Sequence, residues 1–392
     1  MPMLGRLLRV TVWGESHGPA VGAVVEGAPP GIPLTREIVE EELARRRPGR
    51  RYTTPRREPD RAEILSGVHM GYTTGAPVAM LIWNRDVDSS FYEKVVRHRP
   101  RPGHADAAAR LNALGFEDYR GGGPFSGRLT AGLVAAGALA KQLLRLHGVE
   151  VYAYLRRLAG KECPLEPPRS PTSLEELRRM RDQAPVPCPI PGAAEEMARA
   201  LEEAVARGGS AGGVVEAWIL NPPPGMGEPL SGRLDAELAY AMLAIPGVKA
   251  FELGLGTRLV DMTGREAADA LHPTPDGGLA LEPGHGGGTL GGLALGAAIV
   301  ARAYVKPTST IPYPMETIDW RTLGTVETRG AGRHDPAIAV RAVAAVEAAA
   351  AIVAADQLLR RLPSRLMHYY WFERGEAWRR AAEERKKLIH GS

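Results

Sequence analysis

Cysteine is almost absent from this sequence of 392 residues, in which only Cys163 and Cys188 occur. The two are not spaced as a CxxC pair, and they cannot form a zinc site by themselves. Two cysteines are also too few for the disulfide framework of a small secreted domain. We therefore expect a reducing compartment, incidental cysteines and no metal site.

The sequence also has no pattern typical of a secretory signal peptide or a membrane-spanning segment. No long apolar run accompanies Arg6 and Arg9 near the start, which disfavours a signal peptide. The stretch from Leu290 to Val305 is strongly apolar, but it is Gly-rich, short for a membrane span and interrupted by Arg302. It favours a buried core segment, and we expect a cytoplasmic, soluble protein that binds no membrane.

Linkers and short repeats are lacking too, since no Ser- or Gly-rich stretch separates two parts of the chain. The 44% apolar content allows a large core and excludes a mostly disordered chain. We expect one domain over residues 1–361, followed by a basic, helical extension over 362–392.

Helix-like and strand-like patterns alternate along the chain, which indicates an α+β or α/β fold without fixing its topology. Thr35 is a plausible N-cap, and Ser173 with Glu176 matches a capping box. Further helices are predicted at 34–46, 130–146, 193–207, 235–244 and 338–361, and strands at 9–12, 21–25, 63–66, 78–83, 149–155, 214–220 and 293–305.

Arginine, in contrast, is abundant and heavily outnumbers lysine in a chain of formal net charge +4. Its guanidinium group binds phosphate and carboxylate through paired N–H donors. The densest run, RRRPGRRYTTPRRE at 45–58, favours an anion site. A solvated surface run and a nucleic-acid patch are the alternatives, although only Tyr52 could stack on bases and no recognised nucleic-acid motif is present.

Two histidines stand in tight, preorganised turns. His17 lies in GESHG at 14–18, where small neighbours let a ligand approach and Ser16 could relay a proton. His104 lies in RPRPGHAD at 99–106, where prolines fix the loop and a carboxylate follows. The alternatives are a hydrogen-bonded turn histidine and a basic surface loop.

Three further segments suit anions. GGGPFSGR at 121–128 precedes a predicted buried helix, whose N-terminus favours negative charge. The segment is neither a Walker A loop nor a GxGxxG fingerprint. A turn that serves packing alone is the alternative interpretation. KPTST at 306–310 offers an ammonium and hydroxyls, and GRHDP at 332–336 opens a helix with Arg333 and Asp335.

Taken in order, these segments resemble the chorismate synthase family. The matching motifs are GESHG, RRRPG, RYTTPRREPD, ILSGV, RPGHAD, DYRGGG, KPTST and GRHDP. The resemblance runs from about Gly5 to about Arg361. It implies a β-α-β sandwich of antiparallel sheets flanked by helices, with an internal pseudo-repeat, and a homotetramer.

The resemblance also implies a carbon–oxygen lyase that eliminates phosphate from 5-enolpyruvylshikimate 3-phosphate in a 1,4-anti reaction, giving chorismate and requiring reduced FMN. His17 would be the acid at the departing phosphate, His104 would act near flavin N1, and Asp335 would assist proton transfer near N5. Ser16 and Ser126 are candidate relays. Substrate or NADP contacts are implied for Arg46, Arg51 and Arg128, and flavin contacts for Ser126, Pro246, Gly247, Gly291, Lys306, Pro307, Thr308, Ser309, Thr310 and Arg333.

The sequence departs from bacterial members at two places. Pro124 stands where they carry an arginine associated with flavin binding, and Pro246-Gly247 replaces a frequent Asn-Ala pair. The second change leaves backbone contacts available and removes an Asn side-chain contact.

Three other functions stay open at this point. The chain could be a flavin oxidoreductase that uses NADPH, although it lacks a dinucleotide fingerprint. It could bind nucleic acid through its arginine-rich loops, with a steep salt dependence, but this would not explain the two histidines, and we expect no nucleic-acid partner. It could also be a non-catalytic FMN-binding descendant, which the presence of His17, His104 and Asp335 argues against.

Overall fold

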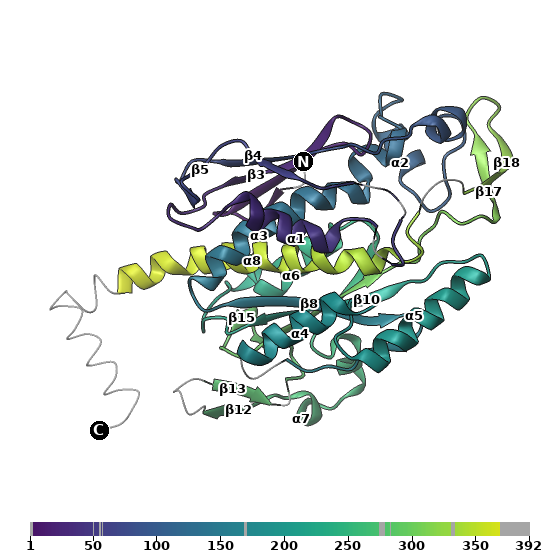
Figure 1. Ribbon diagram of the computed structural model, residues 1–392. Helices are drawn as coiled ribbons and strands as arrows, with labels where there is room; N and C mark the ends of the chain where they lie inside the picture. The colour runs from purple at the N-terminus through teal and green to yellow at the C-terminus, as the bar shows by residue number, and fades with distance from the viewer. Residues whose placement is uncertain are drawn as a thin grey trace, which may run out of the picture.

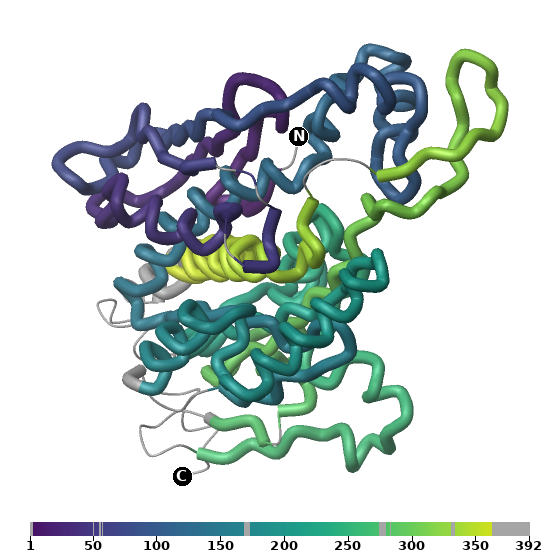
Figure 2. Tube along the Cα trace, turned by 45° about the vertical axis from the view of Figure 1, so that its right-hand side comes forward, coloured from purple at the N-terminus to yellow at the C-terminus, as the bar shows by residue number. Residues whose placement is uncertain are grey.

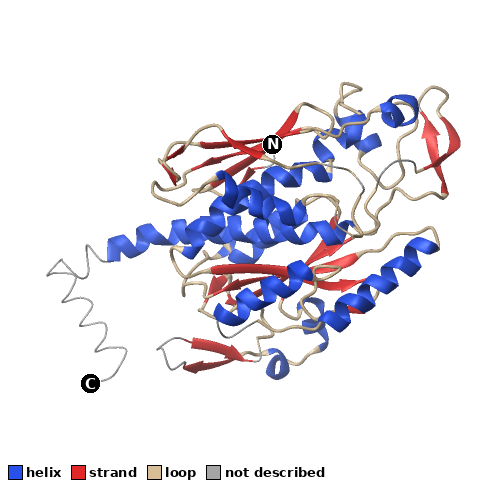
Figure 3. Ribbon diagram, in the orientation of Figure 1, coloured by secondary structure: helices blue, strands red, loops and turns tan. Residues whose placement is uncertain are grey.

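The structure is a computed structural model, and it describes residues 3–49, 51–54, 56, 58–167, 171–273, 279–282, 284–330 and 334–368. Two five-stranded antiparallel sheets enclose a layer of helices (Figures 1 and 3). This is the α+β sandwich of antiparallel sheets and helices that the resemblance predicted.

The first sheet has the order β1-β2-β3-β7-β4. Its strands alternate between buried and less buried residues, as in β7, because only one face packs against the helices. The strands are β1 Met3–Leu4, β2 Arg9–Gly14, β3 Ala20–Glu26, β4 Ala62–Ile64 and β7 Val78–Trp83.

The second sheet has the order β11-β16-β10-β8-β9. Its strands are β8 Glu150–Leu158, β9 Lys161–Glu162, β10 Gly213–Leu220, β11 Val248–Leu253 and β16 Ile299–Val305. Four small hairpins are formed by β5 Val68–His69 with β6 Tyr72–Thr73, β12 Ala270–Pro273 with β13 Leu279–Glu282, β14 Thr289–Leu290 with β15 Leu293–Ala294, and β17 Pro314–Asp319 with β18 Gly324–Arg329.

The helices are α1 Arg36–Arg46, α2 Asp106–Asn112, α3 Thr130–Arg145, α4 Pro171–Gln183, α5 Pro191–Ala206, α6 Leu234–Leu243, α7 Gly264–Ala267 and α8 Ile338–His368. Shorter helical segments are η1 Tyr92–Val96, η2 Arg120–Phe125, η3 Gly127–Leu129, η4 Leu230–Gly232 and η5 Gly256–Asp261. In Figure 1, α4 and α5 cover the outer face of the second sheet.

The central layer is built on the contact between α3 and α8. A Cβ atom at Gly137 of α3 would collide with Ala348 of α8, so glycine permits the close approach of the two helices. The stretch 338–362 of α8 is long and apolar enough to span a membrane, but it is largely buried in the fold. The most apolar core segment is therefore this helix rather than Leu290 to Val305, which divides into β15 and β16.

The two sheets repeat one arrangement. The order β2-β3-β7-β4 in the first sheet corresponds to β8-β10-β16-β11 in the second. In the first half α1 connects β3 to the edge strand β4, and in the second half α6 connects β10 to the edge strand β11. A long helix follows the remaining strand in each half, α3 after β7 and α8 after β16. This correspondence confirms the predicted pseudo-repeat.

Most predicted elements appear within a few residues of their expected bounds, including β7 and the Thr35 cap, whose side chain accepts a hydrogen bond from the Ile38 amide. The predicted start at Ser173 was wrong, because α4 already begins at Pro171. α8 runs to His368, beyond the predicted end at 361, and residues 369–392 of the extension lie outside the described part.

The expectation of incidental cysteines was also wrong. Cys163 and Cys188 form a disulfide across a sequence separation of 25 residues, and neither side chain is exposed. The pair joins the segment after β9 to the segment between α4 and α5. Their wide spacing in the sequence gave no sign that folding would bring them together.

Candidate functional site

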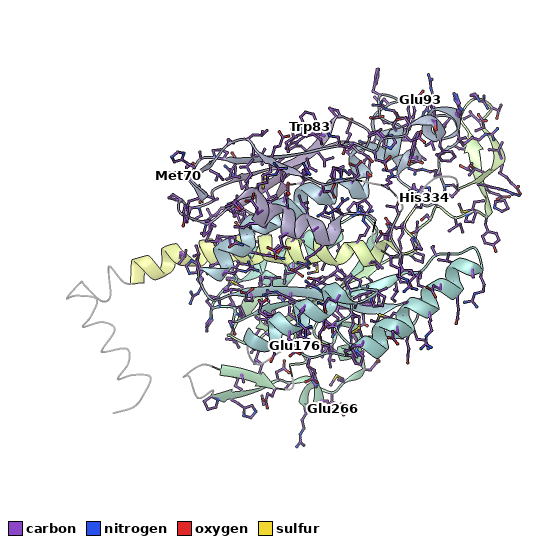
Figure 4. The ribbon with its side chains drawn as sticks, in the orientation of Figure 1. Met70, Trp83, Glu93, Glu176, Glu266 and His334 are labelled. Atoms are coloured by element: carbon purple, nitrogen blue, oxygen red, sulfur yellow. A yellow bond between two sulfur atoms is a disulfide. The ribbon has the colours of Figure 1, made fainter. Side chains whose placement is uncertain are left out.

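Segments from both halves of the chain meet at one end of the helical layer. In Figure 2 the blue loops near residue 100 and the light-green hairpin β17–β18 lie together at this end, and the Trp320 amide donates to the His98 carbonyl at 2.9 Å. Figure 4 shows His334 just before the N-terminal end of α8, at the same end of the molecule as Glu93 of η1.

His17 follows β2 and is only 5% exposed. Its Nδ1 lies 2.9 Å from the Ser89 hydroxyl, and its ring meets the Tyr92 ring edge-on at 4.9 Å between centroids. Its Nε2 is buried and has no hydrogen-bond partner among the described residues. One ring nitrogen is thus oriented by the protein, while the other has its hydrogen-bonding capacity unused among the described residues.

The Gly-rich segment 121–123 closes one side of this histidine. A Cβ atom at Gly121 would collide with the His17 ring and lie 2.8 Å from the Ser16 hydroxyl. The Gly123 carbonyl accepts from the amides of Ser16 at 3.4 Å and Ser126 at 3.3 Å. The backbone of this segment therefore brings the two predicted serine relays together, and Pro124 beside it leaves these contacts intact.

The charge state of His17 follows from this burial. Desolvation lowers its pKa to about 4, and the positive charge of Arg56 acts in the same direction, as does Arg120, against Asp118 and Asp88. The neighbouring Glu15 has a raised pKa because it is desolvated and faces the Asp118 carboxylate. The free site therefore contains a neutral imidazole among charged groups of both signs.

His104 lies at the other side of the site, in the loop before α2. Its Nε2 is 2.6 Å from the Thr310 hydroxyl. Desolvation lowers its pKa to about 4, and Arg101, Lys306 and His334 add to the effect while Asp106 opposes it. The structure thus joins the RPGHAD loop to the KPTST segment.

The segment 306–310 follows β16 and forms a polar cradle. The Lys306 ammonium donates to the Gly103 carbonyl and, at 3.0 Å, to the Ser309 hydroxyl. A Cβ atom at Gly103 would lie 2.6 Å from that hydroxyl, so only glycine permits this approach. The Lys306 amide donates to the Gly247 carbonyl at 2.9 Å, which places Pro246 and Gly247 beside Lys306.

Asp335 is held next to this cradle. Its carboxylate accepts from the Thr54 amide at 2.8 Å and from Arg341 at 3.0 Å, and its carbonyl accepts from Thr308 at 2.7 Å. Arg341 also donates to the Arg46 carbonyl at 3.0 Å. Asp335 therefore ties the start of α8 to the arginine-rich loop and to residues 306–310.

Two of the predicted anion-binding arginines lie in a buried cluster around Asp60. Arg46 donates to Asp60 at 3.1 Å, to Thr130 at 2.9 Å and to the Gly127 carbonyl at 2.9 Å. Arg128 donates to Asp60 and, at 2.8 Å, to Asn84. Desolvation, together with Arg341 and Arg128, lowers the Arg46 pKa to about 9 despite Asp60.

Other predicted residues lie apart. Arg51 is exposed and pairs with Glu202 of α5 at 2.9 Å. Gly291 is in the turn between β14 and β15, where the next residue, Gly292, accepts from the Leu234 amide at the start of α6. Pro246 and Gly247 follow the other end of that ten-residue helix, about 15 Å away. Arg333 lies outside the described residues.

Sequence reasoning missed the supporting residues of the site, namely Ser89, Tyr92, Arg101, Thr54 and Asp60. Of these, Arg101, Thr54 and Asp60 carried a signal, because each belongs to a motif that was noted for other residues. Ser89 and Tyr92 lie in an ordinary segment, and their contacts with His17 exist only in the folded chain.

Comparisons with known proteins point to one family. A sequence model described as chorismate synthase matches residues 8–359. The chain is 51% identical over 378 residues to the chorismate synthase of Aeropyrum pernix, covering 95% of this chain and 98% of that protein. It is 48% identical to that of Methanopyrus kandleri over 92% of this chain and 93% of the relative. A crystal structure of chorismate synthase has a TM-score of 0.70 at 29% identity, covering 91% of this chain and 93% of its own.

Proposed function

Since this chain belongs to the chorismate synthase family, we propose that the end of the molecule containing His17 and His104 is the site at which it carries out the family's reaction. The chain is a lyase that performs the last step of the shikimate pathway, the elimination of phosphate from 5-enolpyruvylshikimate 3-phosphate to give chorismate. The proposal concerns where this chemistry occurs and which residues perform it.

The buried, unpartnered Nε2 of His17 is the observation that supports the proposal most. Ser89 and Tyr92 orient the ring, so that Nε2 can donate a proton to the departing phosphate. The lowered pKa means that the ring is neutral before substrate binds. The negative charge of a phosphate beside Nε2 favours the protonated form, which couples proton uptake to substrate binding.

The charged surroundings suit a substrate with a phosphate and two carboxylates. Arg56 and Arg120 contribute positive charge around His17. Arg46 and Arg128 are both bound to Asp60. We propose that their N–H groups not used by Asp60 are directed toward the anionic groups of the substrate. Ser16 and Ser126 would relay protons beside them.

Members of the family need a reduced flavin, and the residues around His104 suit FMN in donor chemistry. Lys306, Thr308, Ser309 and Thr310 supply an ammonium and hydroxyls within one short segment, with Pro307 between them and Gly103 allowing close approach. Reduced FMN, when bound, supplies electron density to the allylic system of the substrate. His104 and Asp335 would hold protons on the flavin side of the site.

Pro246 and Gly247 can contribute backbone groups to the same flavin because they lie next to Lys306. Gly291 lies at the opposite end of α6, and we propose that it contacts the flavin of a second copy of the chain in the homotetramer that the family resemblance implies. Arg333 remains a proposed ligand from outside the described residues.

A cytoplasmic location is proposed with this function. The disulfide between Cys163 and Cys188 is compatible with it, because intracellular proteins of hyperthermophiles also carry disulfides. We propose no nucleic-acid partner, which is supported by the buried ion pairs of Arg45 and Arg46 and by the pairing of Arg51 with Glu202. Arg51 is exposed enough to contact NADPH if the chain reduces its own flavin.

The test is an anaerobic assay of the full chain with 5-enolpyruvylshikimate 3-phosphate. We expect phosphate and chorismate to appear in equal amounts with photoreduced FMN, and neither to appear with oxidised FMN alone. Absence of phosphate release with reduced FMN would overturn the proposal. A parallel aerobic reaction with NADPH and oxidised FMN tells whether the chain reduces flavin itself, because only then does product form.

A further inference from the structure

Tyr92 and Arg101 connect the two histidines of the site, and we propose that this pair acts as a positioning device that sets His17 and His104 relative to each other. We call it the Tyr92–Arg101 bridge. Neither residue belongs to the set that the family resemblance implied. The proposal rests on the proposed function, since it concerns the same site, and it makes both residues positioning rather than catalytic.

The first contact of the bridge is made by Tyr92 with His17. Tyr92 begins η1 and is 6% exposed. Its ring meets the His17 ring at 4.9 Å between centroids and an interplanar angle of 75°. This edge-to-face arrangement is a preferred geometry for aromatic rings. Because Ser89 fixes Nδ1 from the same segment, the tyrosine ring determines the tilt of the imidazole.

The second contact is made by Arg101 with the loop that carries His104. Arg101 binds Asp106 through two parallel hydrogen bonds, both of 2.8 Å, and its amide donates to the same carboxylate at 2.9 Å. The His104 amide donates to the Arg101 carbonyl at 3.2 Å within this closed loop. The ion pair therefore holds together the two ends of the six-residue segment that contains His104.

The two halves of the bridge meet face to face. The Arg101 guanidinium lies 5.1 Å from the centroid of the Tyr92 ring, and one of its nitrogens is 3.5 Å from the Tyr92 hydroxyl. The Arg101 side chain is 9% exposed and that of Asp106 6%, so the stacked arginine is largely shielded from water. A cation stacked on an aromatic face is worth more when desolvated.

The glycine segment adds a third support. A Cβ atom at Gly122 would lie 3.7 Å from the Arg101 guanidinium, while the preceding Gly121 is packed against the His17 ring. Arg101 thus lies beside a segment that closes over the other histidine. Tilting either histidine would require movement of Tyr92, Arg101 or this segment, and densely packed groups transmit such shifts.

The kinetic test uses the full chain with reduced FMN. Arg101→Lys keeps the charge and loses the paired hydrogen bonds, and Tyr92→Leu removes the ring. We expect kcat to fall ~10- to 100-fold in each, with KM within about 2-fold, because misplacement of reacting groups by about 1 Å costs up to about 10²-fold in rate. Tyr92→Phe, which keeps the ring, should recover most of kcat.

Arg110→Lys is the matched control. Arg110 is also stacked on an aromatic ring, 5.3 Å from the centroid of Trp320, but it touches neither histidine. We expect its kcat to equal that of the unmodified chain. Thermal unfolding of every variant shows whether it is folded at the assay temperature. Full kcat in both folded Arg101→Lys and Tyr92→Leu, or an equal loss in Arg110→Lys, would overturn the proposal.

A second readout needs no activity, namely NMR titration of selectively labelled histidines in Arg101→Gln and Tyr92→Leu. The charged groups that face His104 are Arg101, Asp106, Lys306 and His334, and those that face His17 are Arg56, Asp118, Arg120 and Asp88. Removing Arg101 should raise the His104 pKa, because its positive charge is lost and Asp106 remains. Removing the Tyr92 ring should raise the His17 pKa by admitting water.

If the bridge couples the two histidines, Arg101→Gln should also shift the pKa of His17, and Tyr92→Leu should also shift the pKa of His104. Shifts confined to the directly contacted histidine would contradict the bridge, and so would the absence of any shift. If the unmodified chain is inactive but the variants show the expected pKa shifts of both histidines, only the proposed function is contradicted. The two failures can therefore be told apart.

Discussion

At the scale of single residues, His17 combines a fixed ring orientation with a free nitrogen. Ser89 lies 2.9 Å from Nδ1, whereas Nε2 is buried without a partner among the described residues. Buried polar atoms usually have hydrogen-bond partners, and an exception points to a ligand or a chemical role. Burial also keeps the ring neutral until an anion arrives.

Replacing His17 by Gln should lower kcat by ~10²–10⁴-fold, which is the usual contribution of a positioned acid. The fold should persist, since Gln can still bond to Ser89. His69→Gln in β5 is the matched control, because this histidine is exposed and far from the site in sequence. Steady-state phosphate release under anaerobic conditions measures the effect, and a kcat within a few-fold of the unmodified chain would rule out the proposed role.

The histidines also predict how stability depends on pH. Their pKa values are lowered from 6.5 to about 4 in the folded chain. The unfolded chain therefore binds more protons between these limits, so stability should fall as the pH decreases from about 6.5 to about 4. In His17→Gln the slope of the unfolding free energy against pH should be smaller by up to about 1.4 kcal/mol per pH unit. Urea unfolding at several pH values measures this slope, and identical slopes would contradict the prediction.

Sequence reasoning found the histidines because each lies in a compact, unusual motif. It could not find Ser89 or Tyr92, whose contact with His17 crosses some seventy positions of the chain. It also assigned Arg46 and Arg128 to ligands without seeing Asp60, which binds both. Which charged residues pair over long sequence distances depends on the tertiary fold, so it cannot be predicted from a local sequence pattern.

At the scale of elements, the disulfide supports the outer layer around α4 and α5. It closes a segment of 25 residues and is fully buried. In the chain-entropy view, a loop of this length stabilises the fold by ~3 kcal/mol. Cys163→Ser with Cys188→Ser should lower the unfolding free energy by about that amount in urea.

Reduction provides the control for this prediction. Dithiothreitol should lower the stability of the unmodified chain once the disulfide is accessible, and it should not affect the double serine variant. Equal stability of the two chains under oxidising conditions would show that the disulfide contributes nothing.

Regular elements were largely predictable because their pattern reflects burial: β7 alternates with its one buried face, and α3 is apolar nearly all round because it is buried on all sides. The start of α4 was misplaced, since Pro171 serves as the first helical residue ahead of the apparent capping box. The hairpin β17–β18 was missed because most of its residues are at least partly exposed and its polar composition lacks a strand signature. It is held by Asp319 against Arg99 and by Thr317 against the Pro100 carbonyl.

At the scale of the whole molecule, a buried ion cluster joins the two halves of the pseudo-repeat. Glu347 of α8 is 1% exposed and binds Lys141 of α3, Arg45 of α1 at 2.6 Å and Arg181 of α4 at 2.8 Å. It also accepts from the Ala153 amide in β8 at 2.9 Å. These cations hold its pKa well below the ordinary value even though burial opposes this.

Glu347→Ala should therefore destabilise the whole fold by ~3–5 kcal/mol, because three buried cations lose the carboxylate that they share and keep only Glu42 or Asp182 as partners. The measurement is urea unfolding followed by two probes, one in each half. Both transitions should shift together if the cluster joins the halves, whereas a shift confined to one probe would contradict this account. Glu175→Ala, which removes an exposed ion pair within α4, is the control and should change stability little.

The pairing order of the two sheets could not be predicted from sequence, because alternation reveals a strand without naming its neighbours. The pseudo-repeat came from the family resemblance and is confirmed by the matching orders β2-β3-β7-β4 and β8-β10-β16-β11. Its consequence is that loops of the two halves meet at one end of the helical layer. His17 comes from the first half and Lys306 to Thr310 from the second.

The most direct test of this account is a crystal structure of the full chain with 5-enolpyruvylshikimate 3-phosphate and oxidised FMN. We predict that the substrate phosphate lies within hydrogen-bonding distance of His17 Nε2 and that the flavin contacts His104 and the segment 306–310. A substrate phosphate bound away from His17, or a flavin bound away from His104, would contradict it.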